Sequence, residues 1–210
     1  MNDGYRHRRL RLLIKKFNKE RKKQAKKIDI LCNDLIAAQR DFIKRLDTIS
    51  FAADFYESIA GLTDLNGLLS AVGKLTKDEM PDVNIAFFLR QADSFELHMF
   101  ESNQPITLEK QRLENCFTPE LVNNICKSNK VCTIDDMFAM GMEGNLNILN
   151  KISAVTIPLS LPGLSLGFIL IYRSSQDKLT TDELSKIAAV TSGLSRAIQS
   201  CQALLPHTAE

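Results

Sequence analysis

Few residues in this sequence have the types and spacing that chemistry requires. His98 is the only histidine in the body of the chain, because His7 and His207 lie near its two ends. One imidazole without a cysteine or carboxylate at ligand spacing does not make a metal site. We therefore expect no metal, and an ordinary surface or core position is favoured for His98.

Asp135 and Asp136 are adjacent carboxylates that follow a short apolar run. Neighbouring acidic residues in a turn usually cap a helix or remain as solvated charges. General acid–base catalysis needs carboxylates that converge on a pocket, and adjacency in the sequence does not indicate this.

The five cysteines are an odd number and include no Cys-x-x-Cys pair, so neither a disulfide framework nor a zinc site is indicated. We expect reduced thiols. Cys116, Cys126 and Cys132 could converge in a thiol-dependent reductase, which is the least favoured hypothesis, because a buried thiol is more often an inert small hydrophobic group. The sequence predicts a protein that is not an enzyme and has no cofactor.

Composition and charge divide the chain into two parts. Its 210 residues, 44% of them hydrophobic, suffice for one core-bearing domain with an extension. No apolar run approaches the roughly 18 to 20 residues that cross a bilayer, so a cytoplasmic location is expected. Residues 1–27 hold twelve Lys or Arg and two acidic residues, a balance of +10, so the remainder must carry −8 of the net +2. The chain is a basic arm on an acidic body.

The basic arm is predicted to be helical and has three possible partners. Its cations could neutralise nucleic-acid phosphates, contact anionic lipid headgroups, or solvate the end of a coiled coil, with or without an acidic partner. They are distributed over all faces of the helix, which weakens a specific nucleic-acid hypothesis. The arm residues are Arg6, Arg8, Arg9, Arg11, Lys15, Lys16, Lys19, Arg21, Lys22, Lys23, Lys26 and Lys27.

A heptad pattern runs from Leu10 to Ile59 at alternating intervals of three and four residues, interrupted by Arg21, Gln24 and Arg45. Sustained over this length, it favours a coiled coil, most simply a parallel homodimer. After residue 42 the alternative is a lone amphipathic helix packed on its own domain, and one stripe could serve both purposes. The dimerisation residues expected are Ile28, Leu31, Leu35, Ala38, Phe42 and Ile49.

The strongest strand signal lies at residues 153–172, where two apolar β-favouring runs flank Pro162-Gly163 and predict a hairpin. The second run is apolar on both faces, which is typical of a central strand. Thr180 to Glu183 fits a capping box, and an amphipathic helix follows.

Weaker signals complete the predicted fold. A helix capped by Asp64 or Asn66 should end before Pro81, and strands are expected at 83–90 and 95–101 with a turn at 91–94. A short helix should begin at Thr118-Pro119-Glu120 and a short strand at 131–134, and residues 135–150 are predicted to be a loop with at most one helical turn.

The end of the chain resembles that of a GAF domain. The segments that carry the resemblance are P-L-S-L-P-G-L-S-L-G-F-I-L-I-Y-R and, after a polar loop, L-T-T-D-E-L-S-K-I-A-A-V-T-S-G-L-S-R-A-I. The resemblance covers roughly residues 50–203 and implies an α+β fold, with an antiparallel sheet of about six strands and both terminal helices on one face. We expect three parts: a basic helical arm (1–48), a GAF-like domain (49–203) and a tail (204–210).

The resemblance implies a ligand cavity on the other face of the sheet. From strand alternation, Asn84, Ala86, Phe88, His98, Phe100 and Thr156 would line it, covered by Cys126, Asp135, Asp136 and Met137. Cyclic nucleotides are disfavoured because Asn150-Lys151 lacks the Phe-x-x-x-Asp-Glu that often follows in such members. Bilins are disfavoured because no cysteine is followed by His.

These observations favour a non-enzymatic regulatory module, in which the GAF-like domain of a homodimer binds a small molecule or a partner and signals through the coiled coil. Because only residues 204–210 follow the last helix, output is expected through the N-terminal helix or a separate protein. The alternative is a ligand-free tethering protein whose basic arm binds nucleic acid, an anionic membrane or an acidic partner.

Overall fold

The structure is a computed structural model that describes residues 3–91, 94–100, 113–144 and 149–204. The chain divides into two compact units, Met1–Asp47 and Thr48–Glu210. Residues 205–210 of the expected tail, and residue 101 of the strand expected at 95–101, lie outside the described residues.

Helix α1 (Asp3–Ile59) makes up the described part of the first unit and continues into the second. The predicted long basic helix is therefore confirmed. From Arg6 to Leu46 every side chain of this helix is exposed, including the apolar residues of the heptad stripe. Nothing in the described chain covers that stripe.

The last part of α1 packs on the second unit through a different stripe. Phe51, Phe55 and Ile59 are buried in its core, whereas Ile49 and Tyr56 of the heptad stripe are exposed. At about 100° per residue, the buried set is centred well away from the heptad stripe. The heptad stripe therefore shares only Ile59 and the half-buried Ala52 with the face that packs in the core.

The second unit contains one antiparallel sheet. Its strands are β1 (Asn84–Gln91), β2 (Ser94–Phe100), β3 (Cys132–Thr133), β4 (Ile152–Leu161) and β5 (Leu164–Ser174), in the order β2-β1-β5-β4-β3. The α+β fold class is confirmed. The described residues contain five strands, against the expected number of about six.

Strands β4 and β5 form the predicted hairpin, which turns at Pro162-Gly163, where Gly163 has φ 76°. Its register shifts near the hairpin end, and Gly167 there has φ 133°. Strict alternation, which would put Leu166, Phe168 and Leu170 on one face, fails at this point. Leu166 lies in the same core as Ile169 and Ile171, and Phe168 faces the other side, because the irregularity reverses the phase of the strand.

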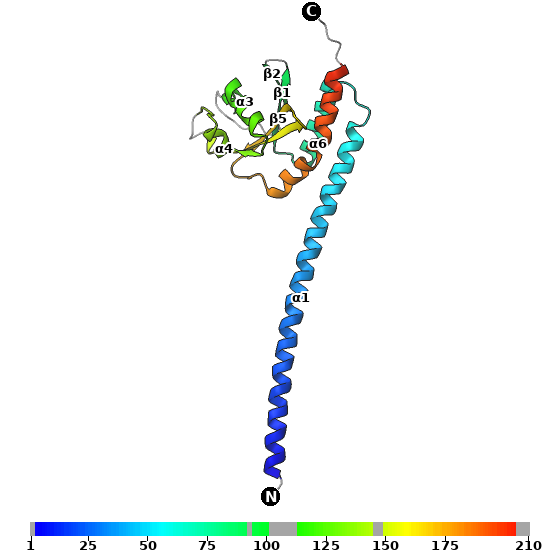
Figure 1. Ribbon diagram of the computed structural model, residues 1–210, viewed down its shortest axis with the longest axis vertical. Coiled ribbons are helices and arrows are strands. Elements are labelled where there is room, and N and C mark those ends of the chain that lie inside the picture. The colour runs from blue at the N-terminus through cyan, green and yellow to red at the C-terminus, as the bar shows by residue number, and fades with distance from the viewer. Residues whose placement is uncertain (1–2, 92–93, 101–112, 145–148, 205–210) are drawn as a thin grey trace, which may run out of the picture. The chain divides into compact units, whose positions relative to one another are not determined.

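Three helical segments cover one face of the sheet: the end of α1, α2 (Leu65–Glu79) and α6 (Thr181–Leu204) (Figure 1). Asp64 caps α2 by accepting a hydrogen bond from the Gly67 N–H at 2.6 Å, and the helix ends before Pro81 as predicted. The Thr180 and Glu183 capping box at the start of α6 is also confirmed.

The opposite face is covered by the 3-10 turn η1 (Leu113–Cys116), α3 (Pro119–Ser128) and α4 (Ile134–Ala139). Thr118 caps α3 with Pro119 in its first turn, as predicted. The prediction of at most one helical turn after residue 134 is wrong, because α4 has six residues. Thr133 and Asp136 form a capping box at the start of α4. The strand predicted at 131–134 therefore ends at Thr133.

Arg173 at the end of β5 connects the sheet to α6. Its guanidinium donates to both carboxylate oxygens of Glu183 at 2.9 Å, and to the carbonyl oxygen of Lys178 at 2.7 Å. Burial raises the pKa of Glu183, but hydrogen bonds from Thr180 and the Arg173 charge outweigh this and hold that pKa below its usual value of 4.5. Glu183 therefore caps α6 and anchors it to the sheet.

Replacing Glu183 by Gln should lower the free energy of unfolding by about 1 to 2 kcal/mol at pH 7. Because the pKa of Glu183 is depressed in the folded protein, its stabilisation is complete above pH 4.5 and is lost as the pH falls below that value. The difference in the free energy of unfolding between wild type and Glu183→Gln, measured with urea, should therefore shrink below pH 4.5. Glu57→Gln, at an exposed position of α1, is the control, and an equal loss there would contradict the prediction.

Candidate functional site

An apolar pocket of about 350 Å³ lies between the β1–β2 edge of the sheet and the start of α3. Its volume is within the range of small-molecule sites in proteins. Most of its wall is aromatic or aliphatic, and Ser94 and Asn123 add polar groups. The lining residues are Phe88, Ser94, Phe95, Leu97, Phe117, Pro119, Val122 and Asn123.

Three phenylalanines from separate segments meet behind this pocket, and two of them, Phe88 and Phe117, line it. Phe88 of β1 stacks on Phe168 of β5, its direct partner in the sheet, with ring centroids 4.7 Å apart and planes inclined by 21°. Phe117 lies 4.9 Å from Phe88 and 5.8 Å from Phe168. Phe88 and Phe117 therefore give the pocket an aromatic wall, against which another aromatic group could pack.

Strand register and helix capping fix the other walls. Phe88 pairs directly with Leu97, so Leu97 and Phe95 of β2 lie on the same face as Phe88. On the other side, the Thr118 hydroxyl accepts a hydrogen bond from the Leu121 N–H at 3.2 Å, which sets the start of α3 and hence Pro119 and Val122. Such a pocket suits a small, uncharged and largely apolar molecule, because none of the described residues that line it is charged.

Several predicted site residues do gather on this face of the sheet. Phe88 lines the pocket, and Asn84, Ala86 and Thr156 lie on the same face, deeper under the covering helices. Cys126 of α3 and Met137 of α4 pack over the sheet as expected. The hydroxyl of Thr156 is fully buried and has no hydrogen-bond partner among the described residues.

His98 and Phe100 lie on the wrong face for the predicted site. His98 pairs with Phe87 and Phe100 with Ile85, and both β1 partners belong to the core under α1, α2 and α6. The His98 Nε2 atom is 3.3 Å from the Glu96 Oε1 atom. The prediction for β2 was offset by one residue. Because side chains alternate along a strand, such an offset places each of them on the other face of the sheet.

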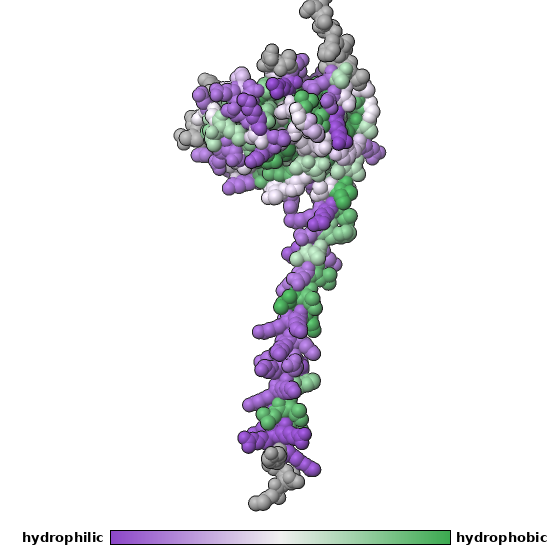
Figure 2. Space-filling view, viewed as in Figure 1, coloured by the Kyte–Doolittle hydropathy of each residue, from purple (hydrophilic) through white to green (hydrophobic). Residues whose placement is uncertain are grey.

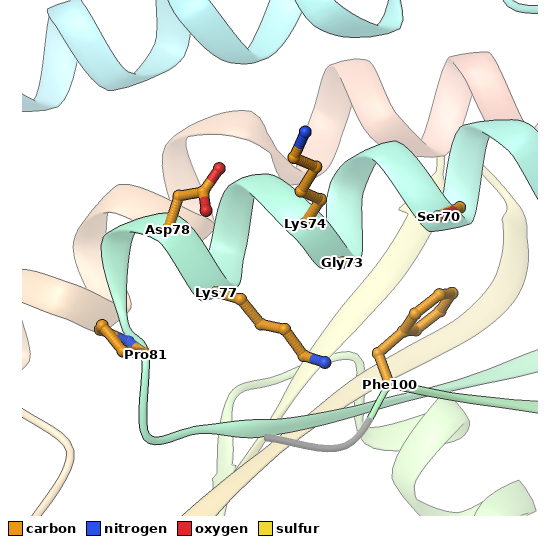
Figure 3. Close-up of a pocket in the computed structure, with 7 residues that line it drawn as sticks. All are labelled: Ser70, Gly73, Lys74, Lys77, Asp78, Pro81 and Phe100. Carbon is orange, nitrogen blue, oxygen red and sulfur yellow. The ribbon is translucent and has the colours of Figure 1, made fainter. Parts of the chain in front are cut away.

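Phe100 instead helps to line a second, more open hollow of about 500 Å³ along α2 (Figure 3). Its ring packs on Gly73, where an added Cβ would lie 2.8 Å from the ring. Figure 3 shows the Lys77 side chain reaching toward Phe100, whereas Lys74 and Asp78 point away. These charges diverge, so the hollow does not present a focused charge to a ligand.

Asp135 and Asp136 are exposed at the start of α4 and do not enter the pocket. Asp136 accepts hydrogen bonds from the Thr133 N–H at 2.8 Å and the Thr133 hydroxyl at 2.7 Å, which hold its pKa below the usual value. The helix-cap interpretation is therefore correct for Asp136.

Two cysteines of this region, Cys126 and Cys132, are buried. Burial raises the pKa of the Cys126 thiol, which outweighs a hydrogen bond from Ser165 and the charge of Arg90. The Cys132 thiol is buried and lies 3.3 Å from the Lys130 carbonyl oxygen. A raised pKa leaves Cys126 protonated at neutral pH, which is unfavourable for nucleophilic thiol chemistry. Across the described residues, no three His, Cys, Asp or Glu side chains are grouped to hold a metal.

Sequence reasoning missed Phe95, Leu97 and Phe117 as pocket residues. A signal for the first two was present, because the turn predicted at 91–94 pairs Gln91 with Ser94, and counting outward pairs Phe88 with Leu97. Phe117 follows a polar stretch with no periodicity, and its position depends on the fold.

No helix within the described ranges has both the length and the apolar character to cross a membrane.

No protein-family model and no curated protein matches the sequence, whereas solved structures do. The GAF domain of a phosphoenolpyruvate-protein phosphotransferase from Acinetobacter has a TM-score of 0.54 and 12% identity, covering 74% of this chain and 95% of its own. The GAF domain/HD domain protein from Geobacter sulfurreducens has a TM-score of 0.52 and 13% identity, covering 69% and 99%.

A third similar structure is the far-red-absorbing dark state of a protein with bound biliverdin IXα, with a TM-score of 0.52 and 14% identity over 72% of this chain and 99% of its own. At these identities the likeness concerns the fold. The predicted resemblance is confirmed at that level, and the second unit of this chain has the fold of a GAF domain.

Proposed function

We propose that this protein is a cytoplasmic, non-enzymatic regulatory module whose GAF-like domain binds a small, uncharged aromatic molecule. The observation that carries the proposal is the 350 Å³ pocket against the Phe88, Phe117 and Phe168 cluster. Five cysteines without a disulfide framework fit a reducing compartment. Bilins and cyclic nucleotides remain disfavoured by the missing sequence patterns.

The pocket is suited to sensing because its walls come from different layers. Phe88 and Leu97 belong to the sheet, whereas Pro119, Val122 and Asn123 belong to α3. A ligand that contacts both layers favours the arrangement in which they fit it, and so it shifts the population toward that state. The output in this proposal is carried by the N-terminal helix or by a separate protein.

The second part of the proposal is that α1 pairs with a second copy of the chain. The stripe from residue 28 to residue 49 repeats at intervals of three and four, interrupted only by Arg45, and each of its apolar residues is exposed. An uncovered apolar seam of this length is characteristic of a coiled coil. The residues concerned are Ile28, Leu31, Leu35, Ala38, Phe42 and Ile49.

The pocket can be tested with N-phenyl-1-naphthylamine, an uncharged aromatic fluorophore. Leu97→Trp should fill the pocket and weaken binding of this probe at least tenfold, since the indole would occupy the space beside Phe88. Met99→Trp is the matched control: Met99 lies on the same strand and face, is 41% exposed against 39% for Leu97, and does not line the pocket.

The expected result is a loss of probe fluorescence confined to Leu97→Trp, with unchanged thermal unfolding in both variants. Equal binding by the two variants would place the probe elsewhere and remove the support for a ligand pocket. The second candidate function, a ligand-free tether, is favoured by the exposed basic arm, and it would then be preferred.

A further inference from the structure

The first part of α1 separates its basic and apolar side chains into two faces. From residue 8 to residue 19, at about 100° per residue, Arg8, Arg9, Arg11, Lys15, Lys16 and Lys19 fall within an arc of about 160°. Leu10, Leu13, Ile14 and Phe17 fall within about 100° on the opposite side. Leu12 is the one apolar residue among the cations. Basic residues occupy all faces only when the whole arm, residues 6–27, is considered.

This apolar face is separated from the coiled-coil stripe. Between Phe17 and Ile28 the heptad positions are Arg21 and Gln24, and the intervening residues are mostly Lys. Figure 2 shows the same division as two apolar patches on the helix with a hydrophilic stretch between them. The first patch is therefore a surface of its own and needs its own partner.

We propose that residues 8–19 lie along the surface of an anionic lipid bilayer, with Leu10, Leu13, Ile14 and Phe17 inserted between the headgroups. Each of these four side chains is exposed in the structure. A helix with Lys and Arg on one face and Leu and Phe on the other is the type that lies in the membrane interface. Anionic headgroups attract each nearby cation, so the charged face adds to the binding.

Two other partners fit this surface less well. Residues 6–19 contain seven cations and no acidic residue. In a parallel pair with a second copy, these seven cations would lie next to seven more and repel them. Nucleic acid would neutralise the cations but would leave the four apolar side chains in water. A lipid surface satisfies both faces at once.

The proposal predicts opposite results for two adjacent leucines of the full-length protein. Leu13→Gln should weaken binding to vesicles of phosphatidylcholine with 30% phosphatidylserine by about tenfold, because the lost side chain is one that inserts. Leu12→Gln should bind like the wild type. The two residues are 58% and 62% exposed, so they are matched in type, position and accessibility.

Vesicle sedimentation provides the measurement, with pure phosphatidylcholine vesicles and a duplex DNA as further arms. We expect binding that needs phosphatidylserine and weakens with salt, and thermal unfolding unchanged in both variants. Equal binding by Leu12→Gln and Leu13→Gln, binding independent of phosphatidylserine, or binding to DNA without binding to vesicles would each overturn the proposal.

Discussion

A Gly167→Ala variant should lose about 3 to 5 kcal/mol of stability and express as a poorly folded protein. Gly167 has φ 133°, a region that side-chain-bearing residues rarely adopt. It also lies in the centre of the sheet, paired with Leu89 of β1 and Leu159 of β4. An added Cβ would overlap the carbonyl oxygen of Phe88 and lie 2.9 Å from its carbonyl carbon. Backbone strain and overpacking therefore act together.

Gly163→Ala in the turn of the same hairpin separates these two effects. Gly163 also has a positive φ, of 76°, but nothing lies within 4 Å of the position of an added Cβ. This variant should lose only about 1 to 2 kcal/mol, through backbone strain alone. Urea unfolding followed by tyrosine fluorescence measures both changes. Equal losses would show that the approach of β1 to Gly167 is not what requires glycine there.

The parts of this fold that local sequence signals determine were predictable, whereas the phase of β5 around Gly167 was not. Local signals were sufficient for the β4–β5 hairpin, the Asp64 and Thr118 caps and the Thr180 capping box, because each depends on residues within a few positions. The phase of β5 around Leu166 was not predictable from alternation, because the irregularity at Gly167 reverses it. A Leu-Gly step inside an apolar strand signals such a bulge only in retrospect.

The candidate site depended even more on long-range pairing. Phe88 lies on the predicted face of the sheet, because it alternates with core residues of β1. His98 and Phe100 were assigned to the wrong face, although the hairpin turn before them already determined the register. Phe117 and Phe168 meet only because η1, α3 and β5 fold together, and no periodicity connects them in the sequence. Pocket residues that come from separate layers are therefore harder to predict from the sequence than the buried residues of a single strand.

Leu35→Asp should convert a dimeric protein into a monomer at micromolar concentration. Leu35 lies in the middle of the stripe from Ile28 to Ile49 and is 62% exposed. In a coiled coil this position faces the partner helix, and two buried, unpaired carboxylates there would be strongly unfavourable. Ile36→Asp is the matched control, because Ile36 is the next residue, also aliphatic and 46% exposed, but outside the heptad stripe.

Sedimentation equilibrium or native mass spectrometry should give a dimer mass for the wild type and for Ile36→Asp, and a monomer mass for Leu35→Asp. Cys32 gives an independent readout, because it is exposed beside Leu31. A short bis-maleimide should join two copies through Cys32 if the helices are parallel and in register, and Leu35→Asp should prevent this. Monomeric wild type, or dissociation by Ile36→Asp as well, would contradict pairing through this stripe, because an interface at its heptad positions distinguishes these two adjacent aliphatic residues.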